Sequence, residues 1–375
     1  MVGGQSHAQW QNKKRTGTDS QKTPSFWRTM EQGIQGEVAP SKTNTLVEQS
    51  NAHSASDASP IISYALPGVA LPRPPPIHLY GKPFRQVESE SHDANQTGRT
   101  PTGLALWPAG KLVSDFLVCG DNPSNNDNDN GETTKATNAV VELGCGLGLC
   151  GLVSHTLLKQ QQKQQQQQQK QRERASTTSK APLVVLTDSD AETLHFARRN
   201  CVKNDCNHQS VKLELLDWCS ERDIQRVKSL SGTLGYSRVL ASDVIYEATA
   251  PLLANLFYAA KTLLSQGGIF VLGIRRRTTS LQEVHEKAAA TGLEGGRFVS
   301  EFLLDIFDNR LEGDCVDIDE DKEEGASDDD DTDDASMLWA QAILVFWHKN
   351  DSIGKEAASS ICRQATERAE EGWLD

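Results

Sequence analysis

The sequence lacks long apolar runs, and it lacks cysteines in the spacing of a redox or zinc motif. No apolar stretch approaches the ~18 residues that a membrane-spanning helix needs, and the opening MVGGQSHAQWQNKKR has no hydrophobic signal-peptide core. The eight cysteines include no Cys-x-x-Cys pair, and several lie in apolar segments. We therefore expect reduced thiols in a cytoplasmic or nuclear protein without a membrane partner.

Grouped metal ligands and basic clusters are also scarce. Cys201, Cys206 and His208 are close in the sequence, but their spacing and number do not match a zinc site, so we predict no metal. The basic run RRR at 275–277 stands alone at the end of an apolar segment. We expect no nucleic-acid partner.

The net charge of −13 could suggest a basic partner, but its distribution argues otherwise. Residues 317–334 contain twelve acids and one lysine, a net charge of −11, which leaves −2 for the rest of the chain. Such a run is typical of a solvated, self-repelling loop. The alternative is a patch that steers a basic substrate toward the protein.

Low-complexity segments divide the chain. Residues 1–74 are rich in Gln, Ser, Thr and Pro and offer little apolar surface to bury, which predicts a disordered region. A folded domain is expected over 75–350, with low-complexity inserts at 120–138, 160–181 and 308–336, and a C-terminal tail at 351–375 can form a helix. We expect a monomer.

Within this domain, short apolar strands alternate with amphipathic helices. This pattern predicts an α/β fold with a mostly parallel, Rossmann-like sheet covered on both faces. Two consecutive strands at the end predict an antiparallel hairpin that closes a seven-stranded sheet. The predicted strands are 139–143, 182–190, 211–218, 238–247, 269–274, 297–305 and 340–349. The predicted helices start near Pro108 and span 149–160, 191–204, 250–268 and 281–293.

A glycine-rich turn, GCGLG, follows the first of these strands within ELGCGLGLCG (142–151). Glycines such as Gly144 and Gly146 allow a sharp turn and close approach of a ligand to the backbone. This pattern alone is shared by many nucleotide-binding folds. Glu142, two residues before the first glycine, suits a cationic ligand and would repel a pyrophosphate.

Acidic and aromatic residues follow the next two strands, where ligands bind in open α/β sheets. Asp188 can accept hydrogen bonds from both ribose hydroxyls, although Asp188 or Asp190 could instead cap the following helix. Asp217 can accept the amino group of an adenine. Trp218 can stack on or flank the adenine ring, unless it is a core residue.

Asp243 and Tyr246 follow the fourth strand in SDVIYE. A carboxylate and a phenol at this edge can orient an amine nucleophile, and the carboxylate can position it or take its proton. Methyl transfer to an amine requires a neutral nitrogen in line with the methyl group, and little covalent help. We therefore predict Asp243 and Tyr246 as the catalytic residues.

The motifs TGLALWPAG, VVELGCGLGLCG, VVLTDSD, ELLDW and LASDVIYE occur in this order. Together they resemble the family-16 protein methyltransferases, a group dominated by protein-lysine methyltransferases of the class I fold that depends on S-adenosylmethionine (SAM). The resemblance covers about residues 77–349. It implies SAM as the cofactor, a protein substrate, and Asp243 and Tyr246 at the substrate mouth. It implies SAM contacts from Trp107, Gly144, Cys145, Gly146, Asp188, Trp218 and Ser242.

Two other readings remain open. The same sheet and cofactor site would serve methylation of arginine, histidine or a small molecule. A non-catalytic SAM-fold interaction module would be marked by loss of the glycine turn, of Asp188 or of the DVIY stretch, and all three are present. The glutamine run after the turn is expected at the amino edge of the sheet, where it can extend the helix without touching the site.

Overall fold

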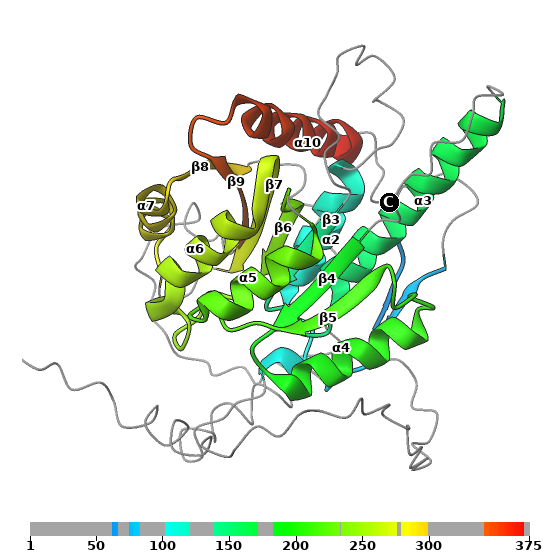
Figure 1. Cartoon of the computed structure of the whole chain (residues 1–375), viewed down its shortest axis with the longest axis horizontal. Coiled ribbons are helices and arrows are strands. Elements are labelled where there is room, and N and C mark those ends of the chain that lie inside the picture. Colours follow the sequence, from blue (N-terminus) through cyan, green and yellow to red (C-terminus); the bar gives the residue numbers. More distant parts are fainter. Residues whose placement is uncertain are drawn as a thin grey trace, which may run out of the picture. The chain divides into compact units, whose positions relative to one another are not determined.

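The computed structural model describes residues 62–66, 75–82, 102–120, 139–171, 183–232, 234–275, 279–298 and 341–370. They belong to one unit of the chain, Ala58–Asp375, whose elements are labelled in Figure 1. The predicted insert at 308–336 lies outside the described residues, as do residues 1–61 and all of the predicted insert 120–138 except Gly120, which ends a helix.

A seven-stranded sheet forms the centre of this unit. Five strands are parallel, and β9 pairs antiparallel with both β7 and β8, so the predicted sheet with its C-terminal hairpin is confirmed. The order across the sheet is β5 (Val211–Leu215), β4 (Leu183–Asp188), β3 (Ala139–Leu143), β6 (Tyr236–Ser242), β7 (Leu264–Arg275), β9 (Gln341–His348) and β8 (Leu293–Phe298).

Helices cover both faces of the sheet (Figure 1). Because successive side chains of a strand point to opposite faces, neighbours such as Val140 and Val141 enter two different hydrophobic cores. One core includes residues of α2 (Pro108–Gly120), α3 (Leu149–Gln171), α4 (Ala191–Lys203) and α10 (Ser352–Glu370). The other includes residues of α5 (Glu221–Leu230), α6 (Leu253–Leu263) and α7 (Leu281–Thr291).

The glutamine run extends α3. The first half of this helix is anchored by buried residues such as Leu152 and Val153, whereas residues 163–167 are exposed. Glutamine and lysine are good helix formers, so the helix continues without packing partners there. In Figure 1 its far end projects away from the sheet.

Folded residues are found before the predicted boundary at residue 75. A small antiparallel pair joins β1 (Ile62–Tyr64) to β2 (Ile77–Leu79). Tyr64 and Leu66 are both 5% exposed, and the hydroxyl of Tyr64 donates to the buried carboxylate of Asp115 on α2. Residues 62–66 therefore pack on the domain, although the predicted boundary excludes them.

Three element predictions need correction. The helix predicted to reach residue 268 ends at Leu263, because Leu264 is extended and pairs with Tyr236 as the first residue of β7. The strand predicted over 297–305 begins at Leu293, and residues 299–305 lie outside the described residues. Helix α5 was not predicted at all.

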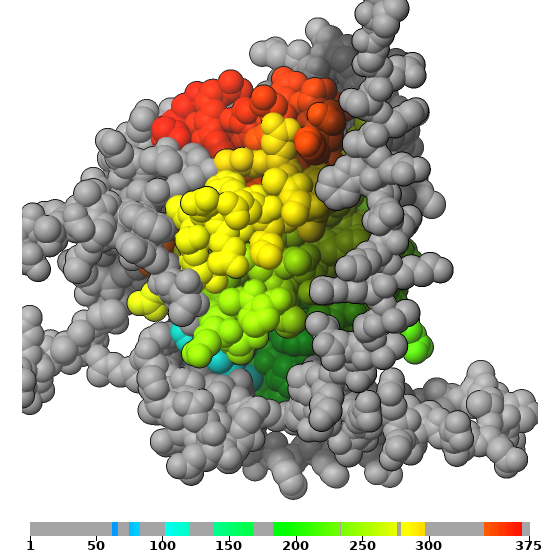
Figure 2. Space-filling view, turned by 90° about the vertical axis from the view of Figure 1, so that its left-hand side faces the viewer, coloured from blue at the N-terminus to red at the C-terminus, as the bar shows by residue number. Residues whose placement is uncertain are grey.

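The C-terminal tail forms α10, which closes one side of the domain. Figure 2 shows its surface, in orange and red, next to the yellow surface of the residues that follow α6. Arg368 of α10 is 6% exposed and donates to Cys119 O at 2.9 Å and to Val118 O at 3.4 Å, at the end of α2. Of the described helices, none is long and apolar enough to cross a membrane.

Candidate active site

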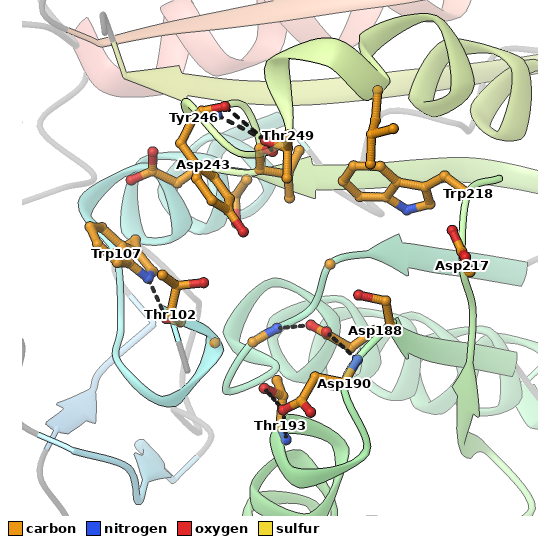
Figure 3. Close-up of a pocket in the computed structure, with 17 residues that line it drawn as sticks. Thr102, Trp107, Asp188, Asp190, Thr193, Asp217, Trp218, Asp243, Tyr246 and Thr249 are labelled. Atoms are coloured by element: carbon orange, nitrogen blue, oxygen red, sulfur yellow. Dashed lines mark hydrogen bonds between the residues drawn. The ribbon is translucent and has the colours of Figure 1, made fainter. Parts of the chain in front are cut away.

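A cavity of about 260 Å³ opens at the carboxyl edge of the sheet. The segments after β3, β4, β5 and β6 meet there because these strands are parallel. Figure 3 shows the side chains arranged around this space. The lining residues are Thr102, Gly103, Trp107, Gly144, Gly146, Asp188, Ser189, Asp190, Thr193, Asp217, Trp218, Ser242, Asp243, Val244, Tyr246, Thr249 and Leu252.

The backbone of the glycine turn forms the floor of the cavity, and a side chain on this turn would clash with neighbouring atoms. Gly144 has φ +64°, and a Cβ there would lie 2.7 Å from Cγ1 of Val244 and 3.6 Å from Cζ2 of Trp218. Gly146 has φ +52°, and its Cβ would lie 3.4 Å from Gly103 O. Glycine at these positions leaves backbone accessible to a ligand without strain.

Asp188 ends β4 and ties two loops together. Its carboxylate accepts from Gly146 N at 3.2 Å and from Asp190 N at 3.0 Å. Burial raises the pKa of Asp188, and the hydrogen bonds from Asp190 and Gly146 partly offset this. The cap of α4 is Asp190, which accepts from Thr193 N at 2.8 Å. Asp188 does not cap that helix, and its side chain lines the cavity.

Asp217 and Trp218 follow β5 on another wall of the cavity. The Asp217 carboxylate accepts from Cys219 N at 2.9 Å. Trp218 is half-buried and packs against the core on the α5–α6 side while one edge of its indole faces Gly144. The core and ligand interpretations of Trp218 are therefore compatible.

Trp107 lies across the cavity from Trp218 (Figure 3). Its Nε1 donates to Thr102 O at 2.7 Å, which fixes the indole against the short helix η3 (Thr102–Leu104). Gly103 of η3 packs closely on α4, because a Cβ there would lie 2.5 Å from Oγ1 of Thr193. The segment before α2 is thus held over the glycine turn.

Asp243 and Tyr246 occupy the wall that follows β6. Asp243 is 6% exposed and has φ +54°, an uncommon conformation for a residue other than glycine. Its N–H donates to Gly273 O at 2.9 Å, which continues the pairing of β6 with β7. Strain of this kind persists only where neighbouring structure enforces it, and it is frequent at functional sites.

A threonine that sequence reasoning missed holds this turn. Thr249 Oγ1 donates to Val244 O at 2.6 Å and accepts from Tyr246 N at 2.9 Å. Figure 3 shows this side chain beside Asp243 and Tyr246. A threonine seven residues after the end of a strand has no signal of its own in a single sequence.

Two of the predicted cofactor residues do not line the cavity. Glu142 is 1% exposed, and its Oε2 accepts from Gly151 N of α3 at 2.9 Å. Burial raises the pKa of Glu142 to about 8, against hydrogen bonds from Gly151 and Cys150 that lower it. Cys145 is also buried, and its N–H donates to Thr187 O at 2.8 Å. Glu142 points into the protein because β3 is covered on both faces, and Cys145, in the turn after β3, packs into the core that includes α2 and α3.

The other predicted residues are brought together. Trp107, Gly144, Gly146, Asp188, Asp217, Trp218, Ser242, Asp243 and Tyr246 all line the one cavity. They come from five separate segments of the chain, and the cavity adds Thr102, Gly103, Ser189, Asp190, Thr193, Val244, Thr249 and Leu252. The added residues are mostly neighbours of a predicted residue within the same loop.

A family model described as lysine methyltransferase matches residues 87–288. The chain belongs to this family. It has the class I methyltransferase fold and is an S-adenosylmethionine-dependent methyltransferase. The match includes the segments that carry every cavity residue.

Solved structures of low sequence identity were also found. A TehB-like SAM-dependent methyltransferase from Corynebacterium glutamicum is 14% identical with a TM-score of 0.33, covering 70% of this chain and all of that one. A fibrillarin pre-rRNA processing protein from Methanococcus jannaschii is 12% identical with a TM-score of 0.35, covering 65% of this chain and 77% of that one. A search of curated proteins gave no match.

The residues around the cavity fit SAM. The turn at Gly144 and Gly146 has no side chain in the space that a ligand would approach. Asp188 and Asp217 offer acceptors for hydroxyl and amino groups, and carboxylates suit a ligand that carries a positive sulfonium. The indoles of Trp107 and Trp218 provide flat apolar surface on two sides.

Proposed function

We propose that this enzyme transfers a methyl group from SAM to the side-chain nitrogen of a lysine in a protein substrate. The observation that carries the proposal is the pair Asp243 and Tyr246 on the cavity wall, in a backbone conformation enforced by β7 and Thr249. Membership of the lysine methyltransferase family supports the same substrate class.

For the cofactor, we assign direct contacts to the residues that line the cavity near the glycine turn. Asp188 accepts the ribose hydroxyls, Asp217 accepts the adenine amino group, and Trp218 flanks the adenine. Gly144 and Gly146 present backbone, and Trp107 and Ser242 complete the pocket. Glu142 and Cys145 support the turn from inside instead, since neither side chain lines the cavity.

For catalysis, bound SAM supplies an electrophilic methyl group. A neutral amine has two N–H bonds and one lone pair. If the Asp243 carboxylate accepts one N–H, the rotation of the amine is restricted and its lone pair can be aimed along the reaction axis. The Tyr246 phenol can hydrogen-bond the amine or pack along the lysine stem, which excludes water. Lysine must first lose its proton, and Asp243 can hold that proton at a carboxylate oxygen or pass it to solvent.

The test uses SAM carrying a deuterated methyl group. The purified chain is incubated with a lysate of its own organism, and labelled peptides are sequenced by mass spectrometry. The proposal expects label on the ε-nitrogen of lysine. Label on arginine, histidine or a small molecule would replace the lysine assignment by the corresponding alternative. If calorimetry detects no SAM binding, methylation of lysine, of another side chain and of a small molecule are all excluded.

A further inference from the structure

Two cysteines, Cys201 and Cys206, meet at the C-terminal end of α4, the end opposite to the one that lines the cavity. The helix ends at Lys203 with Asn204 as its C-cap, Asp205 has φ +52°, and Cys206 N donates to Cys201 O at 3.0 Å. Asp205 N donates to Val202 O at 3.2 Å. These two hydrogen bonds define a Schellman motif. In this motif the residue after the left-handed position, here Cys206, contacts the helical residue three positions before the C-cap, here Cys201. Here the contacting pair is two thiols, both free.

A histidine from another helix adjoins this pair. Cys206 Sγ lies 3.6 Å from Nδ1 of His155, on α3. His155 Nε2 lies 3.1 Å from Ser210 Oγ, whose single proton is donated to Asn207 O at 2.9 Å. Ser210 must therefore accept from His155, which places the imidazole proton on Nε2. With the proton on Nε2, Nδ1 can accept from the thiol of Cys206, whose sulfur also lies 3.7 Å from Asn204 O.

The charged and polar groups around Cys206 favour its thiolate. The thiol of Cys201 hydrogen-bonds to it and lowers its pKa, and His155 and Lys159 of α3 act in the same direction, while burial opposes them. The hydrogen bond to Cys206 and burial raise the pKa of Cys201, so that it keeps its proton. Cys206 is half-buried and Cys201 is buried. One thiol is thus activated and reachable, and the other is held protonated next to it.

Metal binding does not explain the cluster. Within the described residues, no group of three or more His, Cys, Asp or Glu side chains is arranged to hold a metal ion. Packing alone does not explain the cysteine pair either. The hydrophobic contact of a Schellman motif does not require a histidine, whereas here His155 Nδ1 lies beside the sulfur of Cys206.

We propose that Cys206 and Cys201 form a reversible thiol oxidation site, in which Cys206 is the attacking thiolate and Cys201 the resolving thiol. The oxidant is hydrogen peroxide. The Cys206 sulfur attacks the terminal peroxide oxygen, the O–O bond breaks, and the departing oxygen leaves as water once protonated, with His155 Nδ1 holding the thiol proton. The Cys201 sulfur then attacks the sulfenic sulfur, the S–O bond breaks, and a second water leaves. Two thiols and hydrogen peroxide give one disulfide and two waters.

This site is separate from methyl transfer. The N-terminus of α4 at Asp190 lines the cavity, and the pair lies at the opposite end of the helix. Thirteen residues of helix span about 20 Å at 1.5 Å per residue. The thiol chemistry therefore requires neither SAM nor a protein substrate.

The direct test is to map the disulfide. Trypsin cuts after Lys203, between the two cysteines, so the bond would join the peptides 200–203 and 204–212. After brief treatment of the folded protein with hydrogen peroxide, we expect this linked pair to form and to separate on reduction with dithiothreitol. Absence of the linked pair, with thermal unfolding unchanged, would overturn the proposal.

Variants separate the two roles. In Cys201→Ser, Cys206 should stop at the sulfenic acid and be trapped by dimedone, whereas in Cys206→Ser, Cys201 should stay reduced. If Cys201 is oxidised in Cys206→Ser as fast as the wild-type pair, the roles assigned here are wrong.

Cys219 is the internal control and needs no variant. The Cys219 residue is exposed, but partial burial of the thiol and the neighbouring Asp217 raise the pKa of Cys219. At mildly acidic pH iodoacetamide should modify Cys206 at least about ten times faster than Cys219, since each unit of thiol pKa changes the thiolate fraction tenfold. Equal or faster labelling of Cys219 would contradict the proposal.

Discussion

The hydroxyl of Thr249 accepts a hydrogen bond from the backbone N–H of Tyr246 at 2.9 Å. The same oxygen donates to Val244 O at 2.6 Å. One side chain thus fixes the turn that presents both proposed catalytic residues. Because Thr249 both lines the cavity and holds this turn, losing its hydroxyl should lower the rate of methyl transfer more than changing the size of its side chain.

Thr249→Val keeps the β-branched shape and removes the hydroxyl. We expect kcat for methyl transfer to fall about ten- to a hundred-fold, because small displacements of a catalytic group cost that much, while SAM affinity changes little. Thr249→Ser restores the hydroxyl and should recover most of kcat. Steady-state kinetics with calorimetry checks this, and equal kcat for the Val and Ser variants would exclude a positioning role.

The turn at Gly144 should not tolerate a side chain. Gly144→Ala combines φ +64° with a Cβ 2.7 Å from Val244, so we expect SAM affinity to fall about tenfold or more, equivalent to at least 1.4 kcal/mol. Gly232→Ala is the matched control, because Gly232 has φ +87° and no atom within 4 Å of a Cβ. It should lose about 1–2 kcal/mol of stability and keep its SAM affinity. Unchanged SAM binding by Gly144→Ala would be inconsistent with the proposed contact.

Glu142 should make stability depend on pH. The pKa of Glu142 is about 8 in the folded chain, against an ordinary value of 4.5 that we take for the unfolded chain. As the pH rises, the unfolded chain therefore loses this proton before the folded chain does. The contribution of Glu142 to the free energy of unfolding is fully present below pH 4.5. It is lost as the pH rises through about 8, and the loss is at most about 5 kcal/mol. Glu142→Gln should therefore be stabilised relative to wild type at pH 8 and show a flatter pH profile in urea unfolding.

Glu356→Gln serves as the control for this prediction, because Glu356 is exposed on α10. Its profile should follow that of wild type. If the Glu142→Gln profile also follows wild type across this window, the raised pKa of Glu142 is disproved.

Arg368 should anchor α10 to the end of α2. Arg368→Ala leaves Cys119 O and Val118 O without this donor in a buried setting, and we expect a loss of about 2–4 kcal/mol in unfolding free energy. Arg363→Ala removes an exposed arginine from the same helix and should change stability by about 0.5 kcal/mol or less. Similar losses in both variants would mean that the buried bonds contribute little.

The strands of the sheet were predictable where they are fully buried. β3 reads AVVEL and β9 reads QAILVFWH, and both have the continuous apolar character of strands covered on two faces. Helix α5 was missed because only Ile224 and Val227 are buried in it, too few to establish a period.

β8 was placed too late because its glycines are typical of a loop. In the structure Gly295 pairs with Phe346 of β9, and a Cβ on Gly295 would lie 2.3 Å from that ring. The partner strand, rather than local propensity, makes this segment extended. Pairing partners of this kind cannot be identified from local sequence.

Gly144, Gly146, Asp188, Asp217, Trp218, Asp243 and Tyr246 were found because each lies at or after the carboxyl end of a strand, whereas Trp107 and Ser242 came from the family resemblance. The direction of Glu142 was missed, since a strand buried on both faces gives no alternation to show where a side chain points. The role of Thr249 was missed because it acts through hydrogen bonds to backbone atoms, which depend on the turn rather than on the residue type.

Asp243→Asn tests the central claim most directly. Asparagine adopts positive φ as readily as aspartate, so the variant removes the charge without adding backbone strain. Labelled methyl transfer to lysate protein is measured for wild type and variant side by side, with SAM affinity from calorimetry. We predict methyl-lysine with wild type, none with the variant, and SAM affinities within a few fold. Equal transfer by both proteins, or loss of SAM binding together with transfer, would contradict the catalytic assignment of Asp243.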